Sequence, residues 1–572
     1  MVRAVGIDLG TTYTVVATIR DGRPTIVPNG EGHDLTPSVV GFPKGEKPLV
    51  GQAAVAFAAE NAGRTVFSVK RRMGSNKKIA VADAEYTPQG ISSLILRKVV
   101  ADAEEYLGEG ISQAVITVPA YFNDRQREAT KQAAMLAGLD VARIINEPTA
   151  AALAYGLERE EAHTILVWDL GGGTFDVSIL ELGEGIFEVR SVGGDNWLGG
   201  DDFTTRATEQ LLEDYCKAFG TDFPQEVGAR WSLRELAEKA KLQLSSRPVT
   251  EVRLPVPDQQ GSGYLAVQLT REQLESLTAD LLQRMVVPTR QALEDAGLRP
   301  ADIDRVLLVG GATRTPAVRA LARELLGKEP YRYVDPDRVV AMGAAIEAGV
   351  LLGTIEKIVL IDVLPLTLGI ETLGGLMGRI IARNTALPAS GGRLFTTAAD
   401  YQTSMDIHVL QGERELALDN VSLGRFQLSG IPSAPKGVPK VEVVFEADVD
   451  GMVHISATEL LDGSEVQVRL ASTKLLDPEE IACMVQDAQQ RALEDRRERE
   501  RIQASIKARN LLAAAEIAWK ADCGPNGKLL AQRLTQVSTK LEETLTRGVV
   551  EEIEALSKEL RDALSASSLT KS

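Results

Sequence analysis

The chain has 572 residues, of which 44% are hydrophobic and 25% charged, and its formal net charge at pH 7 is −17. This length predicts roughly three to four domains with a large core, and the acidic balance argues against nucleic acid as the main ligand. The three cysteines and four histidines are scattered, which argues against a disulfide framework, a zinc site and a Ser-His-Asp triad.

The first predicted elements recur later in the chain. "VGIDLGTTYTVVATIRDGRPTIVPNGEG" begins at Val5, and "ILVWDLGGGTFDVSILELGEGIFEVRSVGGD" begins at Ile165. Each stretch indicates a strand, an Asp-Leu-Gly turn, a second strand, a glycine-containing turn and a third strand. Asp8 and Asp169 occupy the same place in the two copies. The opening "MVRAVGIDLG" therefore indicates a strand and not a signal peptide. No uncharged apolar run approaches the length of roughly 18 residues that a membrane span needs, so we expect a cytoplasmic protein without a membrane partner.

The similarity between the copies continues downstream. "AVITVPAYFNDRQREATKQAAMLAGL" indicates a strand and a helix, with Asn123 or Asp124 as N-cap and Gly138 after the C-terminus, and "ARIINEPTAAALAYG" indicates another strand and helix. In the second copy, "RVLLVGGATRTPAVRALARELLG" and "YRYVDPDRVVAMGAAIEAG" repeat this order, with Thr315 as N-cap. Two βββαβα units in tandem predict two α/β lobes that face each other across a cleft.

The glycines of "DLGGGTFDVS", Asp169 to Ser178, have two interpretations. A hairpin that needs positive φ is the structural one. If the two Asp-Leu-Gly turns face each other, however, their backbone N–H groups form anion-binding nests for phosphate. The neighbouring carboxylates can hold hydrated Mg²⁺. The sequence contains neither a G-x-x-x-x-G-K-[ST] loop nor a G-x-G-x-x-G turn that opens a helix after a strand.

The second half of the chain changes character twice. "TIEKIVLIDVLP" is a short apolar segment that is typical of a strand, and residues 364–475 have the alternation of an antiparallel β-sandwich, with turns at Asp450-Gly451 and Asp462-Gly463. From Asp477 the pattern is helical, with a breaking "CGPNG" and two or three further helices between 528 and 564.

Several long motifs resemble those of one protein family. "GIDLGTTYT", "VPAYFNDRQREAT", "IINEPTAAALAYG", "DLGGGTFDVSIL", "LVGGATRTPAV" and "LPLTLGIET" are similar to the bacterial DnaK branch of the seventy-kilodalton heat-shock chaperones. The resemblance implies duplicated actin-like ATPase lobes at 1–353, an interdomain linker at 354–363, a β-sandwich peptide-binding domain at 364–475 and a helical lid at 476–572. It covers the chain to about residue 475 and is less specific beyond it.

The resemblance also implies roles for individual residues. The catalytic group comprises Lys70, Glu147, Asp169, Thr174 and Asp176, and the metal ligands are Asp8 and Asp169. The nucleotide contacts comprise Gly10, Thr11, Thr12, Gly171, Gly172, Gly173, Gly199, Gly200, Glu238, Lys241, Ser245, Gly310, Gly311, Arg314 and Asp337. Ile370, Phe395, Met405 and Ile407 line the peptide pocket, over which Leu373 and Ala398 form an arch. Communication between domains falls to Pro119, Arg127, Val359, Leu360, Ile361 and Asp362, and Lys436 is a candidate lid latch.

Some of these roles have a structural alternative from the residues themselves. Taken singly, the peptide-pocket residues are more typical of a hydrophobic core, and Arg127 is typical of a surface charge on a helix. The expected ligands are ATP or ADP with Mg²⁺, with K⁺ as an optional ion, and unfolded polypeptides. A J-domain co-chaperone and a GrpE-type exchange factor are implied by resemblance alone.

Three alternative functions remain open on the sequence. A small-molecule kinase, which gives the β-sandwich no role, or a filament-forming ATPase, which predicts nucleotide-dependent polymerisation, could share the two lobes. A specialised chaperone with one client would keep the fold and lose general peptide binding. The departures from the family pattern are a short stretch between Lys70 and Thr87, an abbreviated lid without an acidic tail, and Tyr13 and Val15 beside the first turn.

Overall fold

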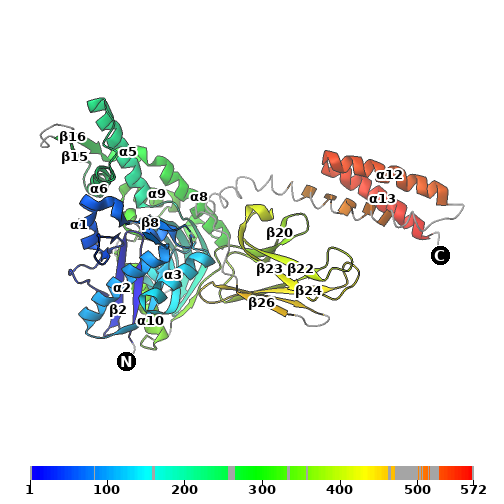
Figure 1. Cartoon of the computed structure of the whole chain (residues 1–572), viewed down its shortest axis with the longest axis horizontal. Helices are drawn as coiled ribbons and strands as arrows, with labels where there is room; N and C mark the ends of the chain where they lie inside the picture. Colours follow the sequence, from blue (N-terminus) through cyan, green and yellow to red (C-terminus); the bar gives the residue numbers. More distant parts are fainter. Residues whose placement is uncertain are drawn as a thin grey trace.

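The chain forms two α/β lobes, a β-sandwich and a C-terminal pair of helices, which follow one another from left to right in Figure 1. The computed structural model describes residues 3–75, 77–82, 84–157, 162–255, 264–331, 335–355, 358–460, 465–469 and 527–569, together with 497, 500, 501, 504, 505, 507–509, 511, 512, 514 and 515.

The first lobe is built on a mixed sheet. β1 (Arg3–Leu9), β2 (Tyr13–Arg20) and β3 (Arg23–Val27) are antiparallel, whereas β10 (Ile111–Val118) and β11 (Asp140–Asn146) run parallel to β1. The strand order is β11-β10-β1-β2-β3. The turn between β2 and β3 has positive φ at both central residues, as the Asp-Gly pair predicts.

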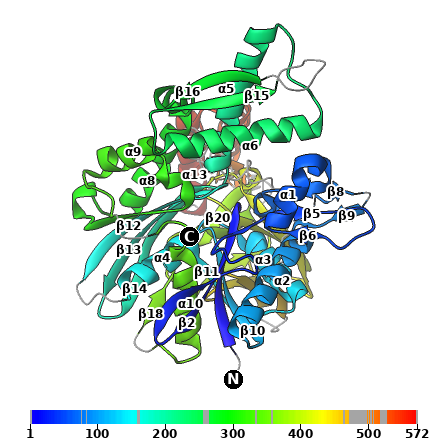
Figure 2. The same cartoon turned by 90° about the vertical axis from the view of Figure 1, so that its left-hand side faces the viewer.

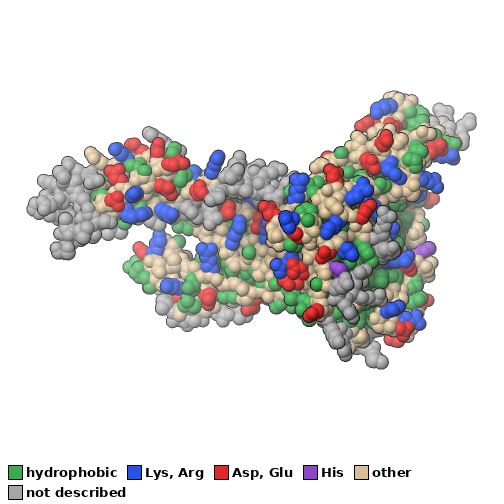
Figure 3. All heavy atoms as spheres, turned by 180° about the vertical axis from the view of Figure 1, so that it is seen from behind, with side chains coloured by type: hydrophobic (Ala, Val, Ile, Leu, Met, Phe, Trp, Pro, Cys, Tyr) green, Lys and Arg blue, Asp and Glu red, His purple; other side chains and the backbone are tan. Residues whose placement is uncertain are grey.

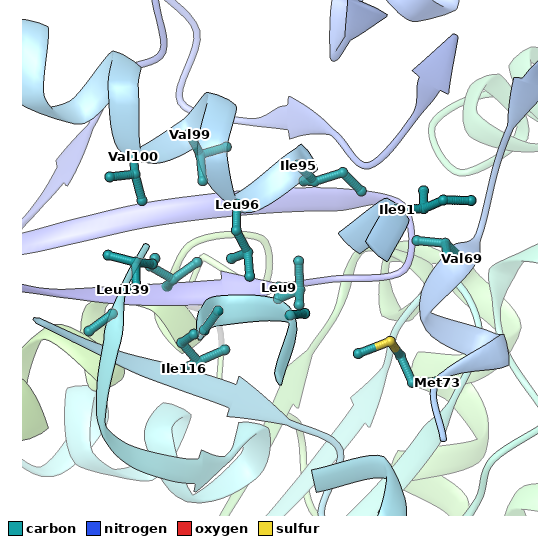
Figure 4. Close-up of a cluster of buried hydrophobic side chains, with 14 of the residues drawn as sticks. Leu9, Val69, Met73, Ile91, Ile95, Leu96, Val99, Val100, Ile116 and Leu139 are labelled. Atoms are coloured by element: carbon teal, nitrogen blue, oxygen red, sulfur yellow. The ribbon is translucent and has the colours of Figure 1, made fainter. Parts of the chain in front are cut away.

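Two helices cover this sheet and enclose its core. α2 (Pro88–Leu107) is a crossover helix that the sequence analysis did not single out, and α3 (Asp124–Ala137) begins at Asn123 with a complete capping box. Figure 4 shows side chains from α2, β1 and β10 meeting between these layers. Smaller elements extend the lobe: β4 (Thr36–Pro37), β5 (Val40–Gly41), β6 (Leu49–Val50), α1 (Gln52–Asn61), β7 (Thr65–Val66), β8 (Ile79–Val81) and β9 (Ala84–Tyr86).

The second lobe repeats the first, as the sequence predicts. β12 (His163–Leu170), β13 (Phe175–Gly183) and β14 (Ile186–Asp195) are antiparallel, and β17 (Arg305–Val309) runs parallel to β12. Its helices and a hairpin are α5 (Gly200–Phe219), α6 (Val227–Leu244), β15 (Val249–Pro255), β16 (Tyr264–Thr270), α7 (Arg271–Leu277), α8 (Ala279–Ala296) and α9 (Pro316–Leu326). Figure 2 shows the two lobes beside each other, with α6 above α1. Of the strand expected in "YRYV" only Tyr331 is described, and its N–H donates to the carbonyl of Val306 in β17 at 2.8 Å.

The lobes are joined by two helices with small side chains. α4 (Glu147–Gly156) and α10 (Val339–Leu351) pack against each other, and α10 also packs on β1 and β2 of the first lobe. A Cβ atom added at Gly343 would lie 1.7 Å from the carbonyl oxygen of Ala150, so the helices approach more closely than any side chain permits. One hydrophobic cluster therefore contains residues of both lobes, among them Val115, Ile145, Leu307 and Val340.

The β-sandwich has two four-stranded antiparallel sheets, which confirms the predicted architecture. One sheet has the order β20-β19-β22-β23 and the other β21-β24-β25-β26. The strands are β19 (Leu368–Thr372), β20 (Leu376–Ile381), β21 (Ala389–Thr396), β22 (Ser404–Gln411), β23 (Val421–Ser429), β24 (Lys440–Ala447), β25 (Val453–Glu459) and β26 (Glu465–Arg469). Their inner faces form one core that includes Phe445, Val443 and Leu428.

The chain ends in α12 (Gly527–Arg547) and α13 (Val550–Leu569), which are the helices expected between 528 and 564. The turn at Asp462-Gly463, the "CGPNG" break and most of the expected helical stretch from Asp477 lie outside the described residues. None of the described helices is long and apolar enough to cross a bilayer. On the face drawn in Figure 3, acidic and basic side chains are interspersed over the surface.

Candidate functional site

The first glycine turn connects β1 to β2 and is fixed by two hydroxyl side chains. Ser38 Oγ donates to the carbonyl oxygen of Gly10 at 2.8 Å, and the Ser38 N–H donates to the carbonyl of Thr12 at 2.8 Å. Thr14 Oγ1 lies 2.9 Å from Ser38 Oγ. These hydrogen bonds engage the carbonyl groups of Gly10 and Thr12 and so fix the backbone on either side of Thr11. The sequence analysis missed Ser38 because it lies outside both glycine motifs.

The second turn, Gly171–Thr174, lies against the first. A Cβ atom added at Gly172 would be 2.0 Å from Thr12 Oγ1, so the two turns meet face to face as the repeat predicts. The first residues of α5 support this turn, because the Gly200 and Asp201 N–H groups donate to the carbonyls of Gly171 and Gly172 at 2.9 and 2.8 Å. Gly199 is the residue that precedes this helix.

Four carboxylates and one lysine gather beside the turns. Lys70, which lies in a 3₁₀ turn at Val69–Arg72, forms a buried ion pair with Glu147 at the start of α4. Asp169 and Asp176 are directly opposite each other on β12 and β13. Asp8, at the end of β1, accepts a hydrogen bond from Thr117 Oγ1 at 3.1 Å. The structure thus brings together the catalytic residues that the sequence predicts, with Thr174 also buried.

This concentration of acid groups raises several pKa values. Burial, followed by the charge of Glu147, raises the pKa of both Asp8 and Asp176 to about 7. The pKa of Asp169 is also raised, first by burial and then by the neighbouring carboxylates, although Lys70 opposes the shift. The single positive charge of Lys70 therefore does not balance the negative charges of the four carboxylates, and the site favours an additional cation.

The carboxylates fit a hydrated divalent cation. Asp8 and Asp169 come from equivalent strands of the two lobes, and Mg²⁺ in proteins takes one or two carboxylates together with water and phosphate oxygens. The buried Asp176 Oδ2 accepts no hydrogen bond from any of the described residues, and an orphaned buried oxygen of this kind indicates a missing water or ion.

The predicted nucleoside contacts form a second group nearby. Lys241 Nζ contacts Glu238 at 2.8 Å and the carbonyl of Gly200 at 2.9 Å, and Ser245 directly follows the last residue of α6. Arg314 donates to Asp337 at 2.6 Å. Gly310 and Gly311 open the 3₁₀ turn that carries Arg314, and a Cβ at Gly311 would lie 2.9 Å from Asp337.

Arg71 is a further residue of this region that the sequence analysis did not identify. Its guanidinium donates to Asp202 Oδ2 at 2.6 Å and to the carbonyl of Gly173 at 3.0 Å. Ser68 also donates to Asp201 at 2.8 Å. These bonds connect the first lobe to the second turn and to α5. They could not be predicted from the sequence because the bonded residues are far apart along the chain.

Arg127 is buried, so its interpretation as a surface charge is wrong. Its guanidinium donates to the carbonyls of Ala120 and Phe122, to Asn146 Oδ1 at 2.6 Å, and to the carbonyl of Asp450 in the β-sandwich at 3.3 Å. Burial lowers its pKa below the ordinary value, although Asp362 and Asp450 oppose this shift. Pro119, which directly precedes the loop of residues 120–122, is also buried.

The segment Val359–Ile361 forms strand β18 and joins the sheet of the second lobe. It pairs in parallel with β14, where Ile186 opposes Val359 and Glu188 opposes Ile361. Asp362 follows and is buried, and it accepts from Asn146 Nδ2 at 2.8 Å. Because Asn146 also accepts a hydrogen bond from Arg127, one hydrogen-bond network joins Asp362, which follows β18, to helix α3.

Further polar contacts hold the sandwich against the lobes. Lys131 Nζ lies 2.5 Å from Asp450 Oδ2, and the Ile144 N–H donates to Asp450 Oδ1 at 3.2 Å. Asp124 accepts from the Val453 N–H at 3.1 Å. On the second lobe, Asp295 accepts from Arg383 at 2.7 Å and from Asn384 at 3.0 Å.

The predicted peptide-pocket residues cluster within the sandwich. Ile370 and Ile407 are buried, and Phe395 and Met405 are partly buried against the same core, so the core and pocket interpretations are both compatible with these positions. Leu373 is 59% exposed and Ala398 is also exposed. The exposed Lys436 donates its backbone N–H to Asp400 at 2.8 Å.

Comparison with protein-family models places these features in a known family. The family described as Hsp70 protein matches residues 4–84 and 75–570, which is nearly the whole chain. Proteins of this family are ATPases and ATP-dependent chaperones that bind peptides, with an actin-like nucleotide-binding domain and a β-sandwich, and they bind ATP or ADP with Mg²⁺. The chain belongs to the Hsp70 family.

Proposed function

We propose that this chain is a general chaperone of the bacterial DnaK type, in which the nucleotide between the lobes controls peptide release through the docked linker. The observation that carries the proposal is the bond network from the nucleotide-side residues to the sandwich. Asn146 directly precedes Glu147 of the acid cluster, and it contacts both Arg127 and Asp362.

The roles proposed for the acid cluster follow from phosphoryl transfer, which requires positioning and charge neutralisation more than covalent chemistry. Asp8 and Asp169 would hold Mg²⁺ through water, and the cation would neutralise phosphate charge. Lys70 would neutralise the terminal phosphate, and Glu147 and Asp176 would orient water. Thr174 and the glycines of both turns cradle phosphate oxygens, while Glu238, Lys241, Ser245, Arg314 and Asp337 contact the nucleoside.

The coupling between domains requires two arrangements that ATP binds differently. In the arrangement of this structure, β18 completes the sheet of the second lobe and Asp450 bonds to the first lobe. We assign this docked arrangement to the ATP state, in which peptide exchanges fast. Hydrolysis then releases the linker and the sandwich, and peptide is held. Reciprocity requires that bound peptide disfavours docking in turn.

The remaining assignments are parts of the same proposal. They comprise the domain boundaries at 353, 363 and 475, a pocket lined by Ile370, Phe395, Met405 and Ile407, the Leu373–Ala398 arch, and a lid. They also comprise K⁺ as an optional ion, a J-domain co-chaperone, a GrpE-type exchange factor and a cytoplasmic location. Only the family resemblance supports the two co-chaperones.

The decisive experiment measures the release rate of a labelled, leucine-centred peptide with ADP and with ATP. Intact protein should release peptide much faster with ATP. The Lys70→Ala variant should still release peptide fast with ATP but should not hydrolyse ATP, because the lysine is assigned to the hydrolysis step and not to docking.

The outcomes separate the alternatives. Peptide binding in neither nucleotide would refute the general-chaperone proposal and favour the single-client chaperone. Binding that ignores the nucleotide would refute the proposed coupling. Nucleotide-dependent polymerisation, followed by light scattering, would favour a filament-forming ATPase.

A further inference from the structure

Arg393 carries a charge on the inner side of the β-sandwich. On β21 it pairs directly with Val443, which is completely buried, so the two side chains point to the same face of the sheet. Phe395, two residues later, lies on this face as well. Arg393 is nevertheless exposed, because β21 is an edge strand of its sheet.

The guanidinium lies among the residues proposed to bind peptide. Its Cζ is 5.9 Å from the centre of the Phe395 ring. A Cβ atom added at Gly378 of β20 would be 3.5 Å from Arg393 Nη1, 2.7 Å from Thr372 Cγ2 and 3.5 Å from the carbonyl oxygen of Ile370. The Arg393 guanidinium therefore lies beside Gly378 of β20, which is paired with Ile370 of β19.

This guanidinium has no anionic partner within the described part of the chain. Arg379 and Arg425, on the other sheet of the sandwich, contact Glu415 and Glu371 at 3.3 and 3.2 Å. Among the described residues, no carboxylate lies within 4.0 Å of Arg393, and its side chain forms no hydrogen bond. An exposed arginine beside an apolar pocket therefore keeps its full donor capacity.

We propose that Arg393 recognises an acidic side chain in the bound peptide, next to the apolar residue that enters the pocket. The inference rests on the proposed peptide site. It makes Arg393 a specificity-determining residue, so that segments combining a leucine-like residue with a nearby Asp or Glu are preferred over otherwise identical neutral or basic segments. The preference is electrostatic and decreases with ionic strength.

The test uses three fluorescein-labelled peptides that differ only beside a central leucine, where they carry Asp, Asn or Lys. Their affinities for the full chain are measured by anisotropy with ADP, at low and at high salt. We expect the Asp peptide to bind roughly threefold to tenfold more tightly than the Asn peptide. Moving the substituted position along the peptide identifies the position that Arg393 contacts.

Arg393→Gln should remove this discrimination while the Asn peptide binds as before. Arg425→Gln is the matched control, because Arg425 is an exposed arginine of the same domain that already has a partner, and it should keep the discrimination. Equal affinities of the three peptides at every position in the intact protein, or a loss in Arg393→Gln that is the same for all of them, would overturn the inference. Failure of all three peptides to bind would instead overturn the proposed peptide site itself.

Discussion

Replacing Asp450 tests whether the sandwich docks through the contacts described above. Asp450 lies in the turn between β24 and β25, and both of its carboxylate oxygens are used across the interface. The exposures of the Lys131 and Asp450 side chains are 19% and 14%, so the ion pair is largely shielded from solvent. Asp450→Ala removes this pair and the acceptor of the Ile144 N–H, but it leaves the backbone carbonyl that Arg127 contacts.

The magnitude follows from these two contacts. A hydrogen bond to a charged group contributes about 1.5–3 kcal/mol, and in the undocked state water satisfies the same groups. We therefore expect Asp450→Ala, which loses both contacts, to weaken docking by about 3–6 kcal/mol, which is a factor of at least roughly 150 in the docking equilibrium. Asp450→Asn keeps the acceptor for Ile144 and should cost about half as much.

Docking can be followed by energy transfer between one dye on the first lobe and one on the sandwich, during titration with ATP. Asp406→Ala is the control, because Asp406 is an exposed acid on β22 away from these contacts. A double-mutant cycle with Lys131→Ala isolates the pair itself. Docking of Asp450→Ala equal to that of the intact chain, or a coupling energy near zero, would refute the reasoning.

Three further predictions address the lobes and the interface. Gly343→Ala should destabilise the ATPase lobes by at least about 3 kcal/mol because its Cβ meets Ala150, whereas Gly228→Ala, with open space around it, should be neutral or stabilising; thermal unfolding of both variants tests this. Burial raises the pKa of Asp124 to about 6 in the docked structure, above its ordinary value of 3.8. The docked form therefore binds the proton more tightly, and docking should strengthen as the pH falls from 7 towards 5. An equal dependence of docking on pH in Asp124→Asn would contradict this. Lys70→Ala should reduce single-turnover ATP hydrolysis by about a hundredfold or more, and unchanged hydrolysis would remove the lysine from the chemistry.

The parts of the fold that depend on local sequence pattern could be predicted from the sequence. The two Asp-Leu-Gly turns, the Asn123 cap and the alternation of the sandwich are local features, and the structure confirms them. The repeat places Asp8 and Asp169 in equivalent positions, whereas Lys70, Glu147 and Asp176 could be added to the acid cluster only through the family resemblance.

The remaining features depend on contacts between distant segments. The helix that carries Arg127 has the pattern of a surface helix, and only docking of the sandwich and the fold of the 120–122 loop bury it. Ser38 supports the first turn from a loop without a recognisable motif. Asp450 appears in the sequence only as the first half of an Asp-Gly turn, although its oxygens meet Lys131 and Ile144.

The pairing of β18 with β14 has a consequence for the state in which the two separate. The second lobe then presents an unpaired sheet edge at 185–188, and an exposed edge is a template for strands of other chains. Ile186, already 46% exposed, adds an apolar side chain to that edge. The pairing covers only three residues and ends at Glu188, whose carboxylate lies 3.0 Å from the guanidinium of Arg190 just beyond it. The edge that the linker leaves behind is therefore short and carries a charged pair, and both features disfavour pairing with a strand of another chain.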